Sequence, residues 1–154
     1  MKTRSVLAAV LFLAGVGVAV AADTDVTMQM GTWKLNDGKS KFAAGAAKNT
    51  TVVYAAAGDM IKITTDGVDK DGKPTHSEWT GKFDGKDYPV TGTTSHDARS
   101  YIPAGKHSLS FTVKKDGKTI QTGKGAVALD GKSRTVTTTG DDPSMNNTAF
   151  YDKQ

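Results

Sequence analysis

Tight-turn signals recur along the whole chain, and their rhythm limits the fold more than any other feature of the sequence. Asp-Gly pairs stand at Asp37-Gly38, Asp66-Gly67, Asp84-Gly85, Asp116-Gly117 and Asp130-Gly131, with other Gly-containing turns between them. Asp-Gly supplies the positive φ angles that two-residue hairpin turns require. Turns spaced by roughly 8 to 15 residues are typical of an antiparallel meander, in which short strands follow one another through hairpins.

The composition agrees with strands and excludes several classes of protein. Residues 23–154 contain three Leu and one Glu against 20 Thr and 15 Asp, so they lack the best helix formers and favour strands and turns. A chain of 154 residues suits one small domain. Because the chain contains no Cys, disulfide scaffolds, thiolate zinc sites and Cys nucleophiles are excluded.

Between the turns, ten segments have the length and alternation of strands. The clearest is 107–114, where Leu109, Phe111 and Val113 share one face and Ser and Thr share the other. This pattern gives the strand one apolar and one wet face. The predicted strands are 31–36, 50–56, 60–65, 74–83, 86–91, 97–102, 107–114, 118–128, 133–139 and 146–152.

One apolar face per strand, without an amphipathic helix to cover a sheet, favours a closed structure, because an open sheet would leave its edges unprotected. The sequence therefore predicts an all-β fold, an up-and-down antiparallel barrel of about eight to ten strands, with a two-sheet sandwich as the alternative. In 118–128 the apolar side chains change face across Gly123 and Gly125, which predicts a bulge or a sharp coil there.

The first 22 residues are predicted to be a cleaved secretory signal peptide. Two basic residues precede an apolar run from Val6 to Val20, and Ala19-Val20-Ala21 offers small residues where a signal peptidase reads. The run is shorter than the roughly 20 residues that a membrane-spanning helix needs. We therefore expect residues 23–154 to form a single barrel domain without an integral membrane span, in a bacterial periplasm or in the medium.

Charge gives little support to a nucleic-acid partner. Loss of Lys2 and Arg4 with the signal peptide changes the formal net charge from +4 to 18 − 16 = +2. Lys and Asp are neighbours along much of the remaining chain, so no basic stripe is formed and we expect no binding to nucleic acid.

The segment Gly31-Thr32-Trp33-Lys34-Leu35 on the first predicted strand resembles the calycins, a group that comprises lipocalins, fatty-acid-binding proteins and avidins. Its residues are most similar to those at the start of fatty-acid-binding proteins. The resemblance implies a ligand-carrying barrel in which Trp33 closes one end and a basic residue of a late strand, here Arg134, lies across its ring. Such a contact contributes about 0.5 to 2 kcal/mol. The Trp-Lys-Leu-Asn opening and the Tyr-Asp-Lys ending also resemble a class of small exported bacterial proteins, a similarity that implies no particular activity.

Two departures from the fatty-acid-binding proteins limit what the resemblance implies. Those proteins place a helix pair between the first two strands, whereas 37–49 leaves room for one helical turn. They also hold the ligand carboxylate with an Arg-x-Tyr pair on the last strand, and 148–151 contains no Arg. Arg99-x-Tyr101 is the nearest candidate, because residues two apart on a strand point to the same side and could hold one anion. A solvent-facing Arg99 beside a rim Tyr101 is the alternative.

No catalytic motif or metal cluster emerges from the spacing of reactive residues. The sequence lacks His-Glu-x-x-His, Gly-x-Ser-x-Gly and a nucleotide-binding loop. His76 and Glu78 share the strand face opposite Trp79 and are expected outside the barrel, whereas His107 is expected to point inward. The sequence thus predicts a protein that is not an enzyme, with no metal and no cofactor.

Two functions remain, a carrier and an interaction module. The carrier is an exported binding protein for a small apolar or amphipathic ligand, and its candidate ligand-binding residues are Trp33, Trp79, Arg99, Tyr101, Phe111 and Arg134. The interaction module is a structural protein of the cell envelope with a filled core and Lys-rich loops that contact a partner. Large apolar side chains are sparse for a barrel of this width, which favours a cavity and therefore the carrier.

Overall fold

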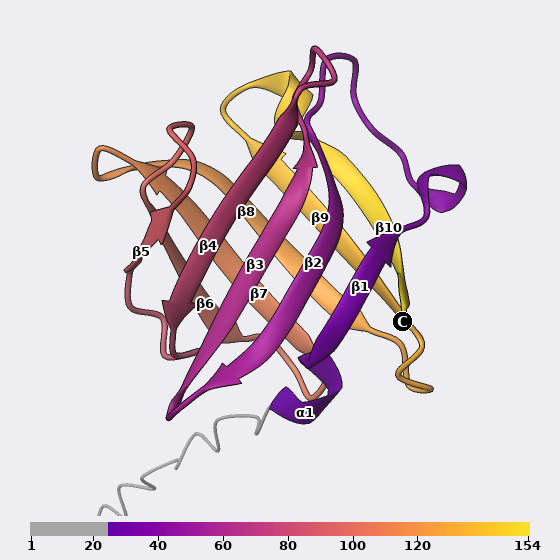
Figure 1. Ribbon diagram of the computed structural model, residues 1–154, viewed down its shortest axis with the longest axis vertical. Coiled ribbons are helices and arrows are strands. Elements are labelled where there is room, and N and C mark those ends of the chain that lie inside the picture. Colours follow the sequence, from indigo (N-terminus) through magenta and orange to yellow (C-terminus); the bar gives the residue numbers. More distant parts are fainter. Residues whose placement is uncertain (1–24) are drawn as a thin grey trace, which may run out of the picture.

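Ten strands pair side by side in chain order and close on themselves, because β1 pairs with both β2 and β10 (Figure 1). The computed structural model describes residues 25–154, so the predicted signal peptide lies outside the described residues. The strands are β1 Gly31–Leu35, β2 Lys48–Ala57, β3 Met60–Val68, β4 Pro74–Gly81, β5 Tyr88–Thr91, β6 Ala98–Pro103, β7 Ser108–Lys115, β8 Lys118–Val127, β9 Ser133–Gly140 and β10 Asn147–Lys153. This closed, antiparallel, up-and-down order confirms the predicted all-β barrel, contradicts the sandwich alternative and is compatible with a calycin-like fold.

Most of the Asp-Gly pairs form turns, as predicted. The hairpin between β7 and β8 turns at Asp116 and Gly117, whose φ angles of 50° and 77° are those of a type I′ turn. The pair at Asp66-Gly67 is the exception, since it lies inside β3. A Cβ on Gly67 would stand 2.2 Å from the Lys48 carbonyl oxygen, so this glycine permits close approach of β2 and does not serve a turn.

A short helix, α1 Val26–Gln29, covers one end of the barrel (Figure 1). The Trp33 indole donates a hydrogen bond to the Gln29 carbonyl oxygen at 2.9 Å, and the Gln29 amide donates to the His107 carbonyl oxygen at 3.1 Å. Both side chains are fully buried. We call this end, with α1 and Trp33, the closed end.

Two 3₁₀ turns, η1 Asp37–Lys39 and η2 Pro143–Met145, lie in the loops toward the other end. The single turn η1 agrees with the prediction that 37–49 has no room for a helix pair. We call this other end, formed by the segments 42–47, 69–73, 92–97 and 141–146, the open end.

The inward-facing side chains form one apolar core along the barrel. The buried members include Trp33, Ile63, Trp79, Tyr101 and Leu109, and Leu35, Ile61, Phe83, Phe111 and Val136 are partly buried against them. Aromatic rings gather around Trp79, with ring centroids at 4.9 Å for Tyr101 and 5.7 Å for Tyr88. Edge-to-face pairs at these distances add specific attraction to the burial of apolar area.

The bulge in β8 lies at a different residue from the one predicted. The register between β7 and β8 shifts between Val113 and Lys114, and Ile120 is left without a partner there. Gly123 and Gly125 instead pair regularly across both neighbouring strands. Both glycines leave space for an inward-facing side chain: a Cβ on Gly123 would stand 2.3 Å from the Phe111 ring, and one on Gly125 would stand 2.5 Å from the Arg134 guanidinium.

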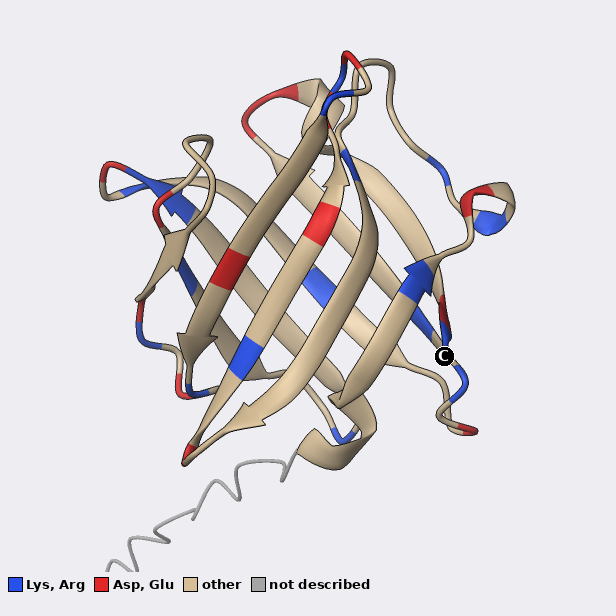
Figure 2. Cartoon of the chain, viewed as in Figure 1, with Lys and Arg blue, Asp and Glu red and all other residues tan. Residues whose placement is uncertain are grey.

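Charged positions of both signs occupy the loops at both ends of the barrel, with few along the strands in this view (Figure 2). Exposed ion pairs on the outer face, such as Lys62 with Glu78 at 2.8 Å, join neighbouring strands. Such exposed pairs contribute little to stability, because solvent and salt screen the two charges. Within the described part of the chain, no helix has the length and apolar character that crossing a membrane requires.

Candidate functional site

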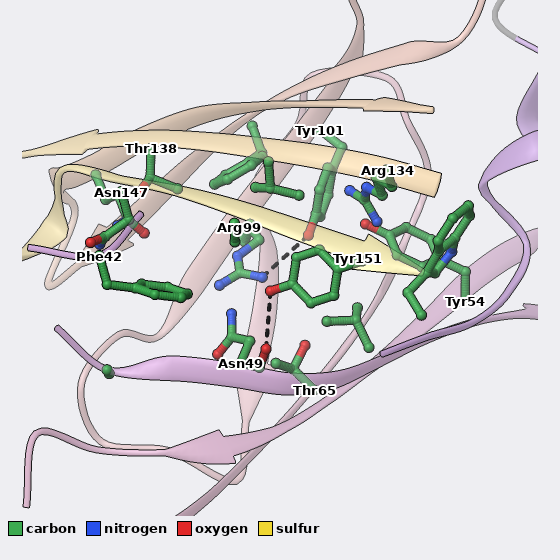
Figure 3. Close-up of a pocket in the computed structure, with 17 residues that line it drawn as sticks. Phe42, Asn49, Tyr54, Thr65, Arg99, Tyr101, Arg134, Thr138, Asn147 and Tyr151 are labelled. Atoms are coloured by element: carbon green, nitrogen blue, oxygen red, sulfur yellow. Dashed lines mark hydrogen bonds between the residues drawn. The ribbon is translucent and has the colours of Figure 1, made fainter. Parts of the chain in front are cut away.

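A cavity of about 110 Å³ lies inside the barrel and reaches from Trp33 at the closed end to residues of the open end (Figure 3). A second space of about 380 Å³ continues it at the open end, and we call this space the mouth. The cavity and the mouth share Asn49, Thr65, Arg99 and Gln121 among their lining residues. A ligand can therefore enter between the loops of the open end.

Arg99 of β6 points into this cavity. One guanidinium nitrogen, Nη1, donates to the Tyr101 hydroxyl at 3.2 Å, and Nη2 lies 3.3 Å from His96 Nε2. The Arg99 Nε is buried and has no hydrogen-bond partner among the described residues. Arg99 and Tyr101 therefore do share a side of the strand, and the solvent-facing alternative does not describe Arg99, which is partly buried and lines the cavity.

His96 is neutral in this arrangement. Since a guanidinium can only donate, His96 Nε2 accepts from Arg99, and Nδ1 carries the proton and donates to the Ser95 hydroxyl at 2.8 Å. Burial, together with the positive charge of Arg99, lowers the pKa of His96 to about 4. The two side-chain hydrogen-bond partners of Arg99 among the described residues, Tyr101 and His96, are therefore both uncharged groups.

Arg134 of β9 lies deeper and is 4% exposed. Its guanidinium carbon is 4.7 Å from the centroid of the Tyr54 ring, and its Nε is also buried without a hydrogen-bond partner among the described residues. A Cβ on Gly125 would stand 2.5 Å from an Arg134 Nη atom, so the glycine makes room for the guanidinium.

The cation expected over Trp33 is a different residue. Lys153 of β10 places its amino group 5.1 Å from the centroid of the Trp33 ring, whereas Arg134 lies over Tyr54. The prediction that Arg134 covers Trp33 is therefore wrong. Because Lys153 covers Trp33, Arg134 does not serve the closed end, and its guanidinium lines the cavity.

Among the described residues, no acidic side chain lines the cavity, although Asp69 lines the mouth together with Lys70. The described lining of the cavity contains Arg99 and Arg134 but no Asp or Glu. Three tyrosines contribute hydroxyl groups, and burial raises the pKa of Tyr151 to about 12 and that of Tyr54 still further, so both stay neutral. The interior is therefore positively charged, with hydroxyl groups and aromatic faces beside the charge.

Trp79 is buried but is not among the described residues that line the cavity. Its indole Nε1 donates to the Arg99 carbonyl oxygen at 2.8 Å. Trp79 therefore supports the backbone of β6 at the residue that presents the guanidinium. Trp33, Phe111 and Tyr101, by contrast, line the cavity directly.

The histidines do not come together. His76 is exposed on the outer face, with Nδ1 2.6 Å from an Asp66 carboxylate oxygen, as its strand parity indicated. His96 lies at the open end and the His107 carbonyl contacts α1 at the closed end. No group of three or more His, Asp or Glu side chains suited to hold a metal ion is present in residues 25–154.

Several lining residues escaped the sequence analysis. Tyr54 and Tyr151 flank the cavity, and the Tyr151 hydroxyl donates to the Asn49 carbonyl oxygen at 3.1 Å (Figure 3). A signal for both tyrosines was available, because Tyr54 shares a strand face with Val52 and Tyr151 shares one with Ala149. Phe42 and Gln121 carried no such signal, since one lies in a loop and the other lies next to the β8 bulge.

Comparison with protein-family models gives no match, and comparison with curated protein sequences gives no significant similarity. The function is therefore inferred from the geometry of the barrel interior.

Proposed function

We propose that the protein is an exported, non-enzymatic binding protein of the calycin type that holds a small amphipathic molecule with an acidic group inside the barrel. One observation carries the proposal: Arg99 and Arg134 both line a cavity whose described lining contains no acidic side chain. A buried charge without a counter-charge is costly, and a bound anion offsets that cost.

The surroundings of Arg99 suit an acidic group that enters from the mouth. The guanidinium keeps an unpartnered Nε, and the Tyr101 hydroxyl can rotate to donate to an incoming oxygen once Arg99 turns toward the ligand. The ring of Phe111 lies 5.8 Å from the guanidinium carbon and offers an apolar surface to the rest of the ligand. Pockets of this kind combine an apolar lining with a few polar anchors.

The cavity favours this function over the alternative of an envelope interaction module with a filled core. A space of about 110 Å³ inside the barrel, continued by the mouth, is not expected in a purely structural module, because filled protein cores are closely packed. The predicted signal peptide supports a location in the periplasm or the medium, where the ligand would be met.

The test compares three ligands that share one alkyl chain and differ in the end group: octanoate, octanol and octylamine. Binding is followed by calorimetry and by the fluorescence of Trp33, which lines the cavity. Octanoate is expected to bind saturably, octanol at least about tenfold more weakly and octylamine not at all, because only the acid pairs with a guanidinium. Equal binding of all three, or none, contradicts the proposal.

Arg99→Met removes the charged guanidinium but keeps an unbranched apolar stem, and should abolish the preference for octanoate over octanol. Lys124→Met is the matched control, because Lys124 is exposed on the outer face of β8 between Gly123 and Gly125. This control removes the same charge and should leave binding unchanged. An equal effect of both variants would assign the preference to overall charge and not to the cavity.

A further inference from the structure

We infer that the ligand carries two acidic groups, one for each buried guanidinium, joined by a short apolar or aromatic segment. This inference rests on the proposed function and makes it more specific. It divides the cavity into an outer anion subsite at Arg99 and an inner anion subsite at Arg134.

The strand register places the two arginines at different levels of the barrel. Arg99 pairs with Val113 of β7, which pairs with Gln121 near the start of β8. Arg134 pairs with Val127, the last residue of β8. The two levels differ by 127 − 121 = 6 residues along β8, and a strand rises about 3.3 Å per residue. The two backbones therefore stand well apart along the strand direction.

The two guanidinium groups have different nearest partners. Arg99 contacts Tyr101 and also His96, which lines the mouth, whereas Arg134 lies over Tyr54. Figure 3 shows them apart, with the ring of Tyr151 between them in this view.

Each group keeps a buried Nε without a hydrogen-bond partner among the described residues. One carboxylate at Arg99 would leave Arg134 unpaired at 4% exposure, and one at Arg134 would leave the partly buried Arg99 unpaired. Breaking or omitting one partner of a buried ion pair leaves a costly uncompensated charge. Two acidic groups satisfy both arginines.

The size of the enclosed space limits the segment between the acidic groups. An apolar cavity of about 150 Å³ holds one benzene molecule, and the space here is about 110 Å³. The inner subsite therefore suits a short alkyl segment or a single small ring, and the mouth holds the remainder. A long fatty-acid chain does not fit the inner space.

The experiment measures the affinity of the full protein for dicarboxylic acids of increasing length, from succinate to sebacate, at neutral pH by calorimetry. Each diacid is compared with the monocarboxylic acid of the same carbon number. The expected result is a diacid affinity that passes through a maximum at one length and there exceeds the matched monoacid by about tenfold or more. Monoacid affinity should show no such maximum.

Two outcomes overturn different statements. If monoacids bind and no diacid exceeds its matched monoacid, the second subsite is wrong while the proposed function stands. If neither class binds, the proposed function is wrong and this inference is wrong with it.

Arg134→Gln provides an independent reading of the inner subsite. It should remove the diacid preference and leave monoacid affinity within about twofold, since the outer subsite is unchanged. Lys124→Gln is the control on the outer face. A diacid preference that survives in Arg134→Gln overturns the assignment of this residue. The wild-type series decides the question if Arg134→Gln does not fold.

Discussion

The closed and open ends of the barrel differ in how their polar groups are satisfied. At the closed end, the Trp33 indole and the Gln29 amide nitrogen donate to backbone carbonyls, and Lys153 lies over the Trp33 ring. Toward the open end, Arg99 has a neutral histidine and a tyrosine hydroxyl as partners and retains an unpartnered Nε. Gln29 Oε1 and His107 Nδ1 at the closed end are also buried without a partner among the described residues, so the open end is distinguished by the fact that its unpartnered atom belongs to a charged guanidinium.

This difference distinguishes residues that stabilise the fold from residues that we propose bind a ligand. Buried polar groups are nearly always paired, so a group paired within the chain contributes to stability. A guanidinium without a counter-charge instead lowers the stability of the empty protein, and a bound anion offsets that cost. The comparison predicts a large loss of stability for a substitution at the closed end and a small change for one at the open end.

The largest expected effect is at the closed end. Trp33→Ala removes a fully buried indole and the hydrogen bond to Gln29, and should lower the free energy of unfolding by about 3 to 5 kcal/mol. Urea denaturation followed by circular dichroism measures this loss. Trp33→Phe keeps a ring without the hydrogen-bond donor, and its free energy of unfolding should lie between those of the wild type and Trp33→Ala. A loss below about 1 kcal/mol for Trp33→Ala would show that the closed end is not a stabilising unit.

A much smaller effect is expected at Arg99. Arg99→Met removes a charge that lacks an acidic partner, so the free energy of unfolding of the ligand-free protein should change by less than about 1 kcal/mol, in either direction. The same denaturation experiment checks this value. If Arg99→Met destabilises the protein as strongly as Trp33→Ala, then Arg99 maintains the fold, and the contrast between the two ends is wrong.

The fold could be predicted from local features of the sequence because hairpins are local. An Asp-Gly turn such as Asp116-Gly117 brings adjacent segments together whatever lies elsewhere in the chain. The predicted strands consequently lie within a few residues of those observed, and the inward parity of Leu109 and Trp79 is correct. The misplaced bulge in β8 shows the limit, since a change of face does not by itself locate the extra residue.

The candidate site could be predicted only in part, because it depends on closure of the barrel. Arg99 and Tyr101 are two residues apart on one strand, and their pairing follows from strand geometry. Arg134 meets Tyr54 only after β1 has paired with both β2 and β10. The partner of Arg134 therefore could not be read from spacing. The inward face of β9 could not be predicted either, because both faces of this strand carry Thr.

The last expected effect depends on pH and concerns His96 at the open end. The pKa of His96 is lowered to about 4 in the folded protein by burial and by Arg99, against an ordinary value of 6.5. The unfolded chain therefore binds more protons than the folded protein between these two values. The stability that neutral His96 provides is present above about pH 6.5 and is lost as the pH falls toward 4.

His96→Gln keeps an acceptor for Arg99 and cannot titrate, so it should reduce the loss of stability between about pH 7.5 and pH 5. The measurement is the difference in urea midpoint between the two pH values, in the wild type and in the variant. Exposed His76 has a raised pKa because of its hydrogen bond to Asp66, and so favours folding at low pH, but its contribution is common to both proteins. Equal pH dependence in the two proteins would mean that His96 is not held neutral by Arg99. The guanidinium would then have a different orientation at the open end, and the outer anion subsite would need a different partner.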